Sequence, residues 1–180
     1  YSKKWKEKLE SHPIPVYESE KHLYALKHLS SDYFPELAEI GYQQQNISFP
    51  NKNFDPILVE NYAKTRDFPA ENGTSKLGIH LRFGTISIRK LTQFAQMHSE
   101  IFLNELIWRN FYMDILWHFP RTAEKSFKPS YDFIPWLNNE ADFERWCTGQ
   151  TGYPLVDAGM RELNATGFLP LNPICLPMRS

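Results

Sequence analysis

The sequence predicts an all-α fold, and three observations support this class. Apolar residues recur every three or four positions in several segments, most strongly over residues 100–118. No run of alternating apolar and polar residues is long enough to form a sheet. Glycine, proline, serine and threonine stand at positions where helices would begin and end. Together these features predict a series of short helices joined by turns.

The N-terminal part of the chain predicts an arm. Residues 1–10 favour a short helix with Trp5 and Leu9 on one side, and residues 18–29 favour a second, weaker helix. The prolines of HPIPV between them indicate an extended connector. We therefore interpret residues 1–52 as an arm or linker and not as a packed domain.

Beyond the arm, each predicted helix is bounded by turn or capping residues. The first contains Leu58 and Tyr62 and ends before the turn RDFPAENG. The second begins after Thr74 or Ser75, whose hydroxyls suit an N-cap, and ends at Gly84. Four later helices are predicted. One follows Thr85 or Ser87, one covers residues 100–118, and a short one lies within residues 130–150. The last begins at Pro154 and ends at Gly167.

Composition excludes several classes of function. The formal net charge is −1, so no overall basic character indicates nucleic acid. The two cysteines are too few for a disulfide scaffold, and the histidines lack metal-binding spacing, so we expect no metal site. No apolar run approaches the ~18 residues of a membrane helix. The polar start is unlike a signal peptide, and we expect a cytoplasmic protein without a membrane partner.

Aromatic residues are the unusual component, at 15% of the 180 residues. Aromatic side chains bury large areas in a core, and they also offer faces on which bases or ring cofactors stack. Both interpretations stay open on composition alone.

A polar stripe lies on the predicted central helix. Residues 101–117 are apolar in nearly every direction, which predicts a buried helix. Glu105, Trp108, Arg109 and Tyr112 nevertheless share one face. Buried charges need a partner or a ligand. Glu105 and Arg109 therefore either pair with each other or line a cavity.

Two loops carry weaker signals. Residues 72–78, NGTSKLG, combine a flexible glycine with two hydroxyls before a helix, which suits either a phosphate cradle or an ordinary helix cap. Residues 149–163 read as a packed loop–helix joint, with Asp157 and Arg161 spaced for an exposed ion pair.

Three long segments carry a family resemblance: YAKTRDFPAENGTSKLGIHLRFGTIS, FLNELIWRNFY and WCTGQTGYPLVDAGMRELNATG. They resemble, in order and spacing, the flavin domain of the DNA photolyase and cryptochrome family, with class I cyclobutane pyrimidine dimer photolyases as the nearest type. The resemblance implies an interdomain arm over residues 1–52 and a partial FAD-binding domain over residues 53–168. It also implies that the family's N-terminal antenna domain is absent from this chain, so the antenna chromophore stays open.

The resemblance implies a light-driven DNA repair lyase that binds FAD and acts as a monomer. In this family the excited, reduced flavin passes an electron to a pyrimidine dimer, which splits and returns it. The lesion in UV-damaged DNA is flipped from the duplex into the pocket; photolyases are among the standard examples of this behaviour. A cryptochrome-type blue-light photoreceptor, and a helical fragment without ligand, stay open as alternatives. The (6-4) lesion class also stays open.

Site residues follow from the resemblance position by position. Residues implied to bind FAD are Tyr62, Thr74, Ser75, Lys76, Leu77, Gly78, Glu105 and Arg109. Those implied to contact DNA are Glu105, Trp108, Arg109, Asn110 and Tyr112, with Glu105 and Trp108 in catalytic positions. Lys76 stands where the family often has arginine, so the charge stays but the bidentate fork is lost. Gly78 stands where serine is common, so one hydroxyl is lost.

The resemblance ends abruptly after NATG. Residues 169–180 contain three prolines that forbid a continuous helix, and we interpret them as an aberrant or truncated tail. The family's remaining flavin contacts and its tryptophan chain would lie beyond this point. A cofactor site assembled from distant segments weakens when one part is missing. We therefore expect weak or no retention of FAD by this chain.

Overall fold

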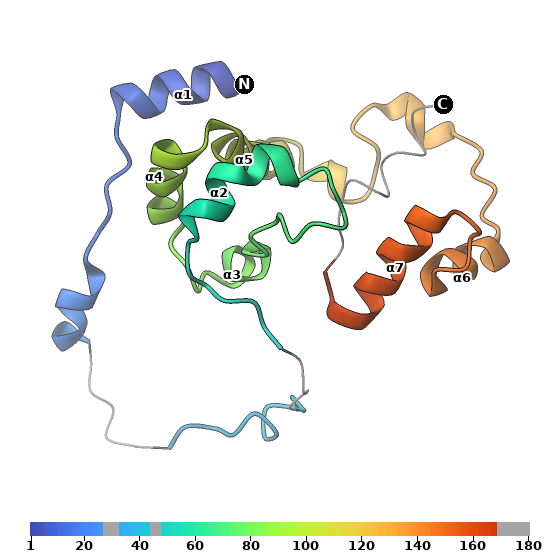
Figure 1. The fold of residues 1–180 in the computed structure, drawn as a ribbon, viewed down its shortest axis with the longest axis horizontal. Helices are drawn as coiled ribbons and strands as arrows, with labels where there is room; N and C mark the ends of the chain where they lie inside the picture. Colours follow the sequence, from blue (N-terminus) through green and yellow to red (C-terminus); the bar gives the residue numbers. More distant parts are fainter. Residues whose placement is uncertain (27–32, 44–47, 169–180) are drawn as a thin grey trace.

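The computed structural model describes residues 1–26, 33–43 and 48–168, and this part of the chain is helical without strands (Figure 1). The predicted all-α class is therefore confirmed. The elements in chain order are α1 (Ser2–Ser11), η1 (Ser19–Ala25), α2 (Pro56–Thr65), α3 (Gly78–Phe83), α4 (Ile88–His98), α5 (Glu100–His118), η2 (Pro120–Ala123), η3 (Pro129–Phe133), α6 (Glu140–Thr148) and α7 (Pro154–Thr166). The tail of residues 169–180 lies outside the described residues.

The helix ends follow the capping residues in most places. Ser87 accepts a hydrogen bond from the Lys90 amide at the start of α4, as predicted. Gly84 and Gly167 end α3 and α7 with φ of 66° and 76°, which confirms both predicted stops. The predicted cap of α3 by Thr74 or Ser75 is wrong. The N-cap is Leu77, because residues 74–76 form a loop without helical structure before the helix begins.

The core forms where α2, α4 and α5 meet. Val59 of α2, Leu91 of α4 and Ile107 of α5 are almost wholly buried. Full burial of one such side chain contributes about 1.5–3 kcal/mol relative to exposure. Tyr62 meets Phe102 edge to face, with ring centroids 5.2 Å apart. This core fixes the first half of α5 against α2, which later positions the site.

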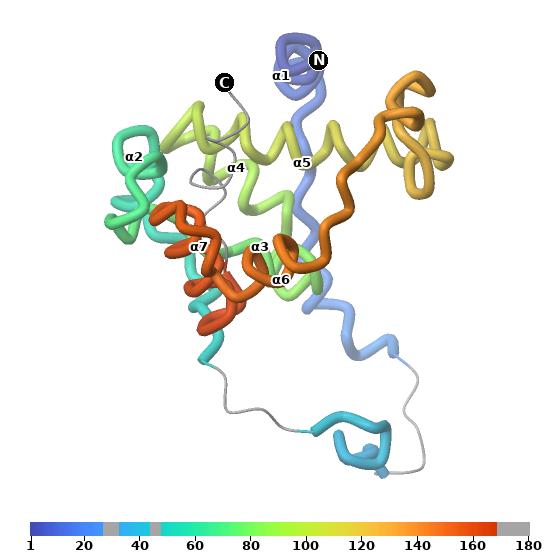
Figure 2. The backbone as a smooth tube through the Cα atoms, turned by 90° about the vertical axis from the view of Figure 1, so that its right-hand side faces the viewer, coloured from blue at the N-terminus to red at the C-terminus, as the bar shows by residue number. Residues whose placement is uncertain are grey.

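Helix α1 packs against α5, although it lies in the predicted arm (Figure 2). The Lys6 ammonium pairs with the Glu100 carboxylate at 2.5 Å. The Ser2 hydroxyl donates to the Asn104 side-chain oxygen at 3.2 Å. Leu9 is buried, so this part of the predicted arm packs against the helical body.

The expectation that α5 is buried on all sides is wrong for its second half. Phe102, Leu103, Leu106 and Ile107 are buried, and all four lie in the first half. Trp117, near the other end, is 83% exposed. The apolar residues in the first half of α5 therefore pack in the core, and those in the second half include exposed side chains such as Trp117.

Helices α6 and α7 pack on each other beside this body (Figure 1). The carboxylate of Asp157 accepts from the Thr151 amide at 2.8 Å, the Thr151 hydroxyl at 2.6 Å and the Gly152 amide at 3.0 Å. The Thr151 hydroxyl bond lowers the pKa of Asp157 against the opposing effect of burial. The predicted exposed ion pair with Arg161 is wrong, because Asp157 is 7% exposed and its carboxylate holds the loop.

Candidate functional site

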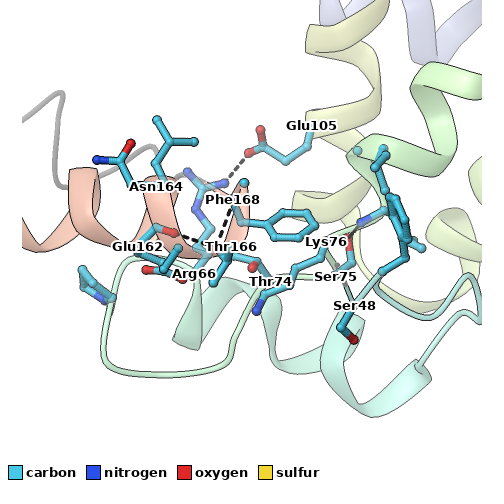
Figure 3. Close-up of a pocket in the computed structure, with 18 of the residues that line it drawn as sticks. Ser48, Arg66, Thr74, Ser75, Lys76, Glu105, Glu162, Asn164, Thr166 and Phe168 are labelled. Carbon is cyan, nitrogen blue, oxygen red and sulfur yellow. Dashed lines mark hydrogen bonds and ion pairs between the residues drawn. The ribbon is translucent and has the colours of Figure 1, made fainter. Parts of the chain in front are cut away.

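A pocket of about 930 Å³ opens between the helical body and the end of α7 (Figure 3). A volume of this order suits a nucleotide-sized ligand. The pocket is lined from five places: residues 48–49, the end of α2 with the turn after it as far as Pro69, residues 74–79, Glu105 of α5, and residues 162–168. Seven of the eight residues predicted to bind FAD line it, namely Tyr62, Thr74, Ser75, Lys76, Leu77, Gly78 and Glu105.

The loop of residues 74–78 is fixed in position by Gly73. A Cβ at Gly73 would lie 2.4 Å from the Thr65 hydroxyl oxygen, so only glycine fits against the end of α2. Lys76 then adopts a left-handed conformation with φ of 51°. The amide of the next residue, Leu77, donates to the Ser75 hydroxyl oxygen at 3.4 Å.

An ion pair crosses the pocket between α2 and α5. Arg66, directly after α2, donates from Nη1 to Oε1 of Glu105 (Figure 3). The guanidinium also lies 5.6 Å from the centre of the Tyr62 ring. Burial acts to lower the pKa of Arg66, but the hydrogen bond and charge of Glu105 outweigh it and raise the pKa. Burial, with the Glu105 charge, raises the pKa of Tyr62.

Arg109 does not join this pocket. Its Nη2 donates to the Leu81 carbonyl oxygen at 3.4 Å, which ties α5 to α3. Of the two alternatives for the charges of α5, pairing of Glu105 with Arg109 is wrong, because Glu105 pairs with Arg66. The other alternative, that these two charged side chains line a cavity, is correct for Glu105 and not for Arg109. The FAD role predicted for Arg109 stays a prediction.

Of the residues predicted to contact DNA, Glu105 lines the pocket, and the other four lie farther along α5 outside the lining. Trp108 is 52% exposed, and its ring centroid lies 6.1 Å from that of the exposed Tyr112. The Asn110 amide donates to the Tyr1 hydroxyl at 2.6 Å and to Asp114 at 2.9 Å. Asn110 therefore contributes to the α1–α5 contact, while Trp108 and Tyr112 form an open aromatic face. Their DNA roles stay predictions.

Several pocket residues were missed by sequence reasoning. Arg66 stood in the quoted segment RDFPAENG, but its partner lies 39 residues away on another helix. Phe168 follows the last helix, and its ring lies 5.7 Å from the Lys76 ammonium across the pocket. Ser48 and Phe49 lie in a stretch without helical periodicity, so no sequence signal placed them at a site.

Two structural features concern metal ions and membranes. Within the described ranges, histidine, cysteine and acidic side chains do not gather into a group of three able to hold a metal ion. Among the helices of residues 1–26, 33–43 and 48–168, none combines the length and the apolar character that a membrane span requires.

Comparisons with known proteins agree on one family. Residues 102–172 match the model of the FAD binding domain of DNA photolyase. The chain is 38% identical over 130 residues to the deoxyribodipyrimidine photo-lyase of Synechococcus, covering 66% of this chain and 27% of that protein. It is 39% identical over 118 residues to that of Escherichia coli, covering 60% of this chain and 25% of the relative.

A solved structure extends the agreement to the fold. A bacterial class III photolyase from Agrobacterium tumefaciens matches with a TM-score of 0.61 and 35% identity, over 66% of this chain and 26% of that one. The chain thus spans about a quarter of the length of each of these relatives. It belongs to the DNA photolyase family, through that family's FAD-binding domain.

Proposed function

We propose that this chain supplies part of the FAD pocket of a light-driven lyase that splits cyclobutane pyrimidine dimers in UV-damaged DNA. One observation carries the proposal. Seven of the eight residues expected to bind FAD come from separate segments and line the same pocket. The domain assignment is part of the proposal: an arm over residues 1–52, a partial FAD-binding domain over residues 53–168, and a divergent tail over residues 169–180.

The pocket fits FAD in its chemistry. FAD carries a pyrophosphate, and the loop in the pocket lining offers the hydroxyls of Thr74 and Ser75 and the Lys76 ammonium. FAD also carries two planar ring systems, and Tyr62 and Phe168 supply aromatic faces in the same lining. Arg66 adds a second positive charge, held in place by Glu105. When bound, FAD supplies the light-driven electron transfer.

The residues of α5 connect the pocket to the DNA. Glu105 lies at the pocket, and its carboxylate is in reach of a polar group bound there. Trp108 lies one helical turn farther on, where its exposed face can stack on a flipped pyrimidine. Tyr112 extends the same aromatic face along α5 toward the duplex. We propose that Glu105 hydrogen-bonds the lesion and that Trp108 packs against it.

The cofactor part of the proposal is tested by titrating the chain with FAD at equilibrium. Saturable binding is expected, too weak to survive gel filtration. Lys76→Glu should raise the Kd about tenfold or more, because it replaces a charge-assisted phosphate contact by repulsion. Lys64→Glu is the matched control, since Lys64 lies on α2 outside the pocket lining. No saturable binding, or equal effects of both variants, would contradict the proposed pocket and favour a helical chain without ligand.

The reaction is tested in the Escherichia coli photo-lyase after its matching segment is replaced by that of this chain. We expect the hybrid to retain flavin and to remove pyrimidine dimers from an oligonucleotide under blue light. Glu105→Ala in the hybrid should slow repair about tenfold, the order of one lost hydrogen bond to a charged group. A hybrid that carries flavin but leaves dimers intact would contradict repair and favour a photoreceptor.

A further inference from the structure

Residues 48–50 form a short strap at the mouth of the pocket. Ser48 and Phe49 both belong to the pocket lining, opposite the end of α7. Figure 3 shows Ser48 close to the loop that carries Ser75 and Lys76. Phe49 is 66% exposed.

The strap is anchored by a histidine of α3. Nε2 of His80 lies 2.9 Å from the Pro50 carbonyl oxygen. A carbonyl oxygen only accepts, so Nε2 carries the proton and donates. The other ring nitrogen, Nδ1, lies 2.8 Å from the Thr85 hydroxyl oxygen, which holds the imidazole plane in place. The Thr85 contact therefore orients the ring, and Nε2 of that ring holds the carbonyl group of Pro50.

A second attachment follows four residues later. Phe54 packs against the hydrophobic core, with its ring centroid 5.3 Å from that of Phe94. Between the two attachments the side chain of Asn51 accepts from the Asn53 amide at 3.0 Å. The segment from Pro50 to Phe54 is thus held at both ends, and Phe49 is the first residue beyond the anchor.

We propose that Phe49 is a ligand-contacting residue of this pocket, whose ring covers a planar ring of the bound flavin nucleotide, and that His80 is its positioning residue. Exposure of a single phenylalanine is ordinary in itself. Here the exposed ring lines a pocket, and a dedicated hydrogen bond fixes the adjoining backbone. The inference rests on the proposed function, because FAD is the ligand it requires.

The experiment measures the Kd for FAD and, separately, tryptic cleavage after Lys52 in the ligand-free chain. Phe49→Ala should raise the Kd roughly tenfold, the order of one lost aromatic stack on a base, and Phe49→Trp should not. Phe83→Ala is the matched control, since Phe83 is 74% exposed on α3 and outside the pocket lining. His80→Phe keeps a ring but loses the donor, whereas His80→Gln keeps a donor that can reach Pro50.

We expect His80→Phe to raise the Kd and to speed cleavage after Lys52, and His80→Gln to restore both toward the starting values. If FAD binds but Phe49→Ala acts no more strongly than Phe83→Ala, the role of Phe49 is refuted and the proposed function stands. If His80→Phe and His80→Gln behave alike in both measurements, the positioning role is refuted. If the unaltered chain does not bind FAD, the proposed function and this inference fall together.

Discussion

Replacing Gly73 by alanine should destabilise the chain and weaken the pocket together. The added Cβ would lie 2.4 Å from the Thr65 hydroxyl oxygen, 2.5 Å from the Thr65 Cβ and 2.9 Å from the Thr65 carbonyl carbon. Ordinary contact begins near 3.4 Å, so the loop and the end of α2 must separate by about 1 Å. Overpacking of this kind costs about 1–3 kcal/mol. The same displacement moves the loop of residues 74–78 away from its position in the pocket lining.

Gly78 provides the matched control in the same loop. A Cβ at Gly78 meets nothing within 4 Å, and its φ is not in the left-handed region. Gly78→Ala at the first residue of α3 should therefore leave stability unchanged or raise it by about 0.4–1 kcal/mol. Urea denaturation followed by circular dichroism measures the free energy of unfolding of both variants. In thermal unfolding, each 1 kcal/mol should shift the Tm by about 2–4 °C at this chain length.

Relief by a second substitution distinguishes a local clash from a general defect. Thr65→Ala removes the hydroxyl contact but keeps the Cβ, so it should restore only part of the stability lost in Gly73→Ala. Equal stability of the Gly73→Ala and Gly78→Ala variants would refute the reasoning, because the steric contrast is then without energetic effect. A Gly73→Ala chain with unchanged stability but lost FAD binding would also contradict it.

Two further predictions concern the polar contacts. A double-mutant cycle on Arg66→Ala and Glu105→Ala should give a coupling of only about 0.2–1 kcal/mol without ligand, because both side chains are partly exposed, at 31% and 41%; a coupling several times larger would mean that the pair is part of the core. Asp157→Asn should lower the Tm at neutral pH, because the amide presents a donor toward the Gly152 amide. Because folding lowers the pKa of Asp157, its carboxylate stabilises the fold fully above the ordinary pKa of 3.8. This stabilisation is lost as pH falls through the lower pKa of the folded state, so the Tm difference between the two chains should shrink in acid. A Tm difference that grows in acid would contradict this assignment.

Local signals predicted the helices well, because capping and periodicity act over a few residues. The range of α5 and the end of α7 at Gly167 follow directly from such signals. Where tertiary contacts decide, prediction failed. The cap of α3 moved to Leu77, because residues 74–76 follow the pocket and not the helix. Asp157 became a buried loop anchor, although its spacing to Arg161 had suggested a surface pair.

The site was predicted in part for the same reason. Residues of one continuous loop, such as Ser75 and Lys76, could be assigned together from their motif. The partner of Glu105 could not, because helical spacing identifies neighbours on one helix and Arg66 lies beyond the end of another. Residues 48–49 line the pocket beside the contact between Pro50 and His80, which no local sequence pattern indicates.

The location of bound FAD tests the central claim most directly. Amide chemical shifts of the isotopically labelled chain, followed by NMR during FAD titration, report which backbone groups meet the ligand. The account predicts the largest shifts at Thr74–Gly78, with smaller ones at Tyr62, Glu105 and the end of α7. Shifts confined to the open aromatic face at Trp108 and Tyr112, or no saturable shifts at the loop, would contradict it.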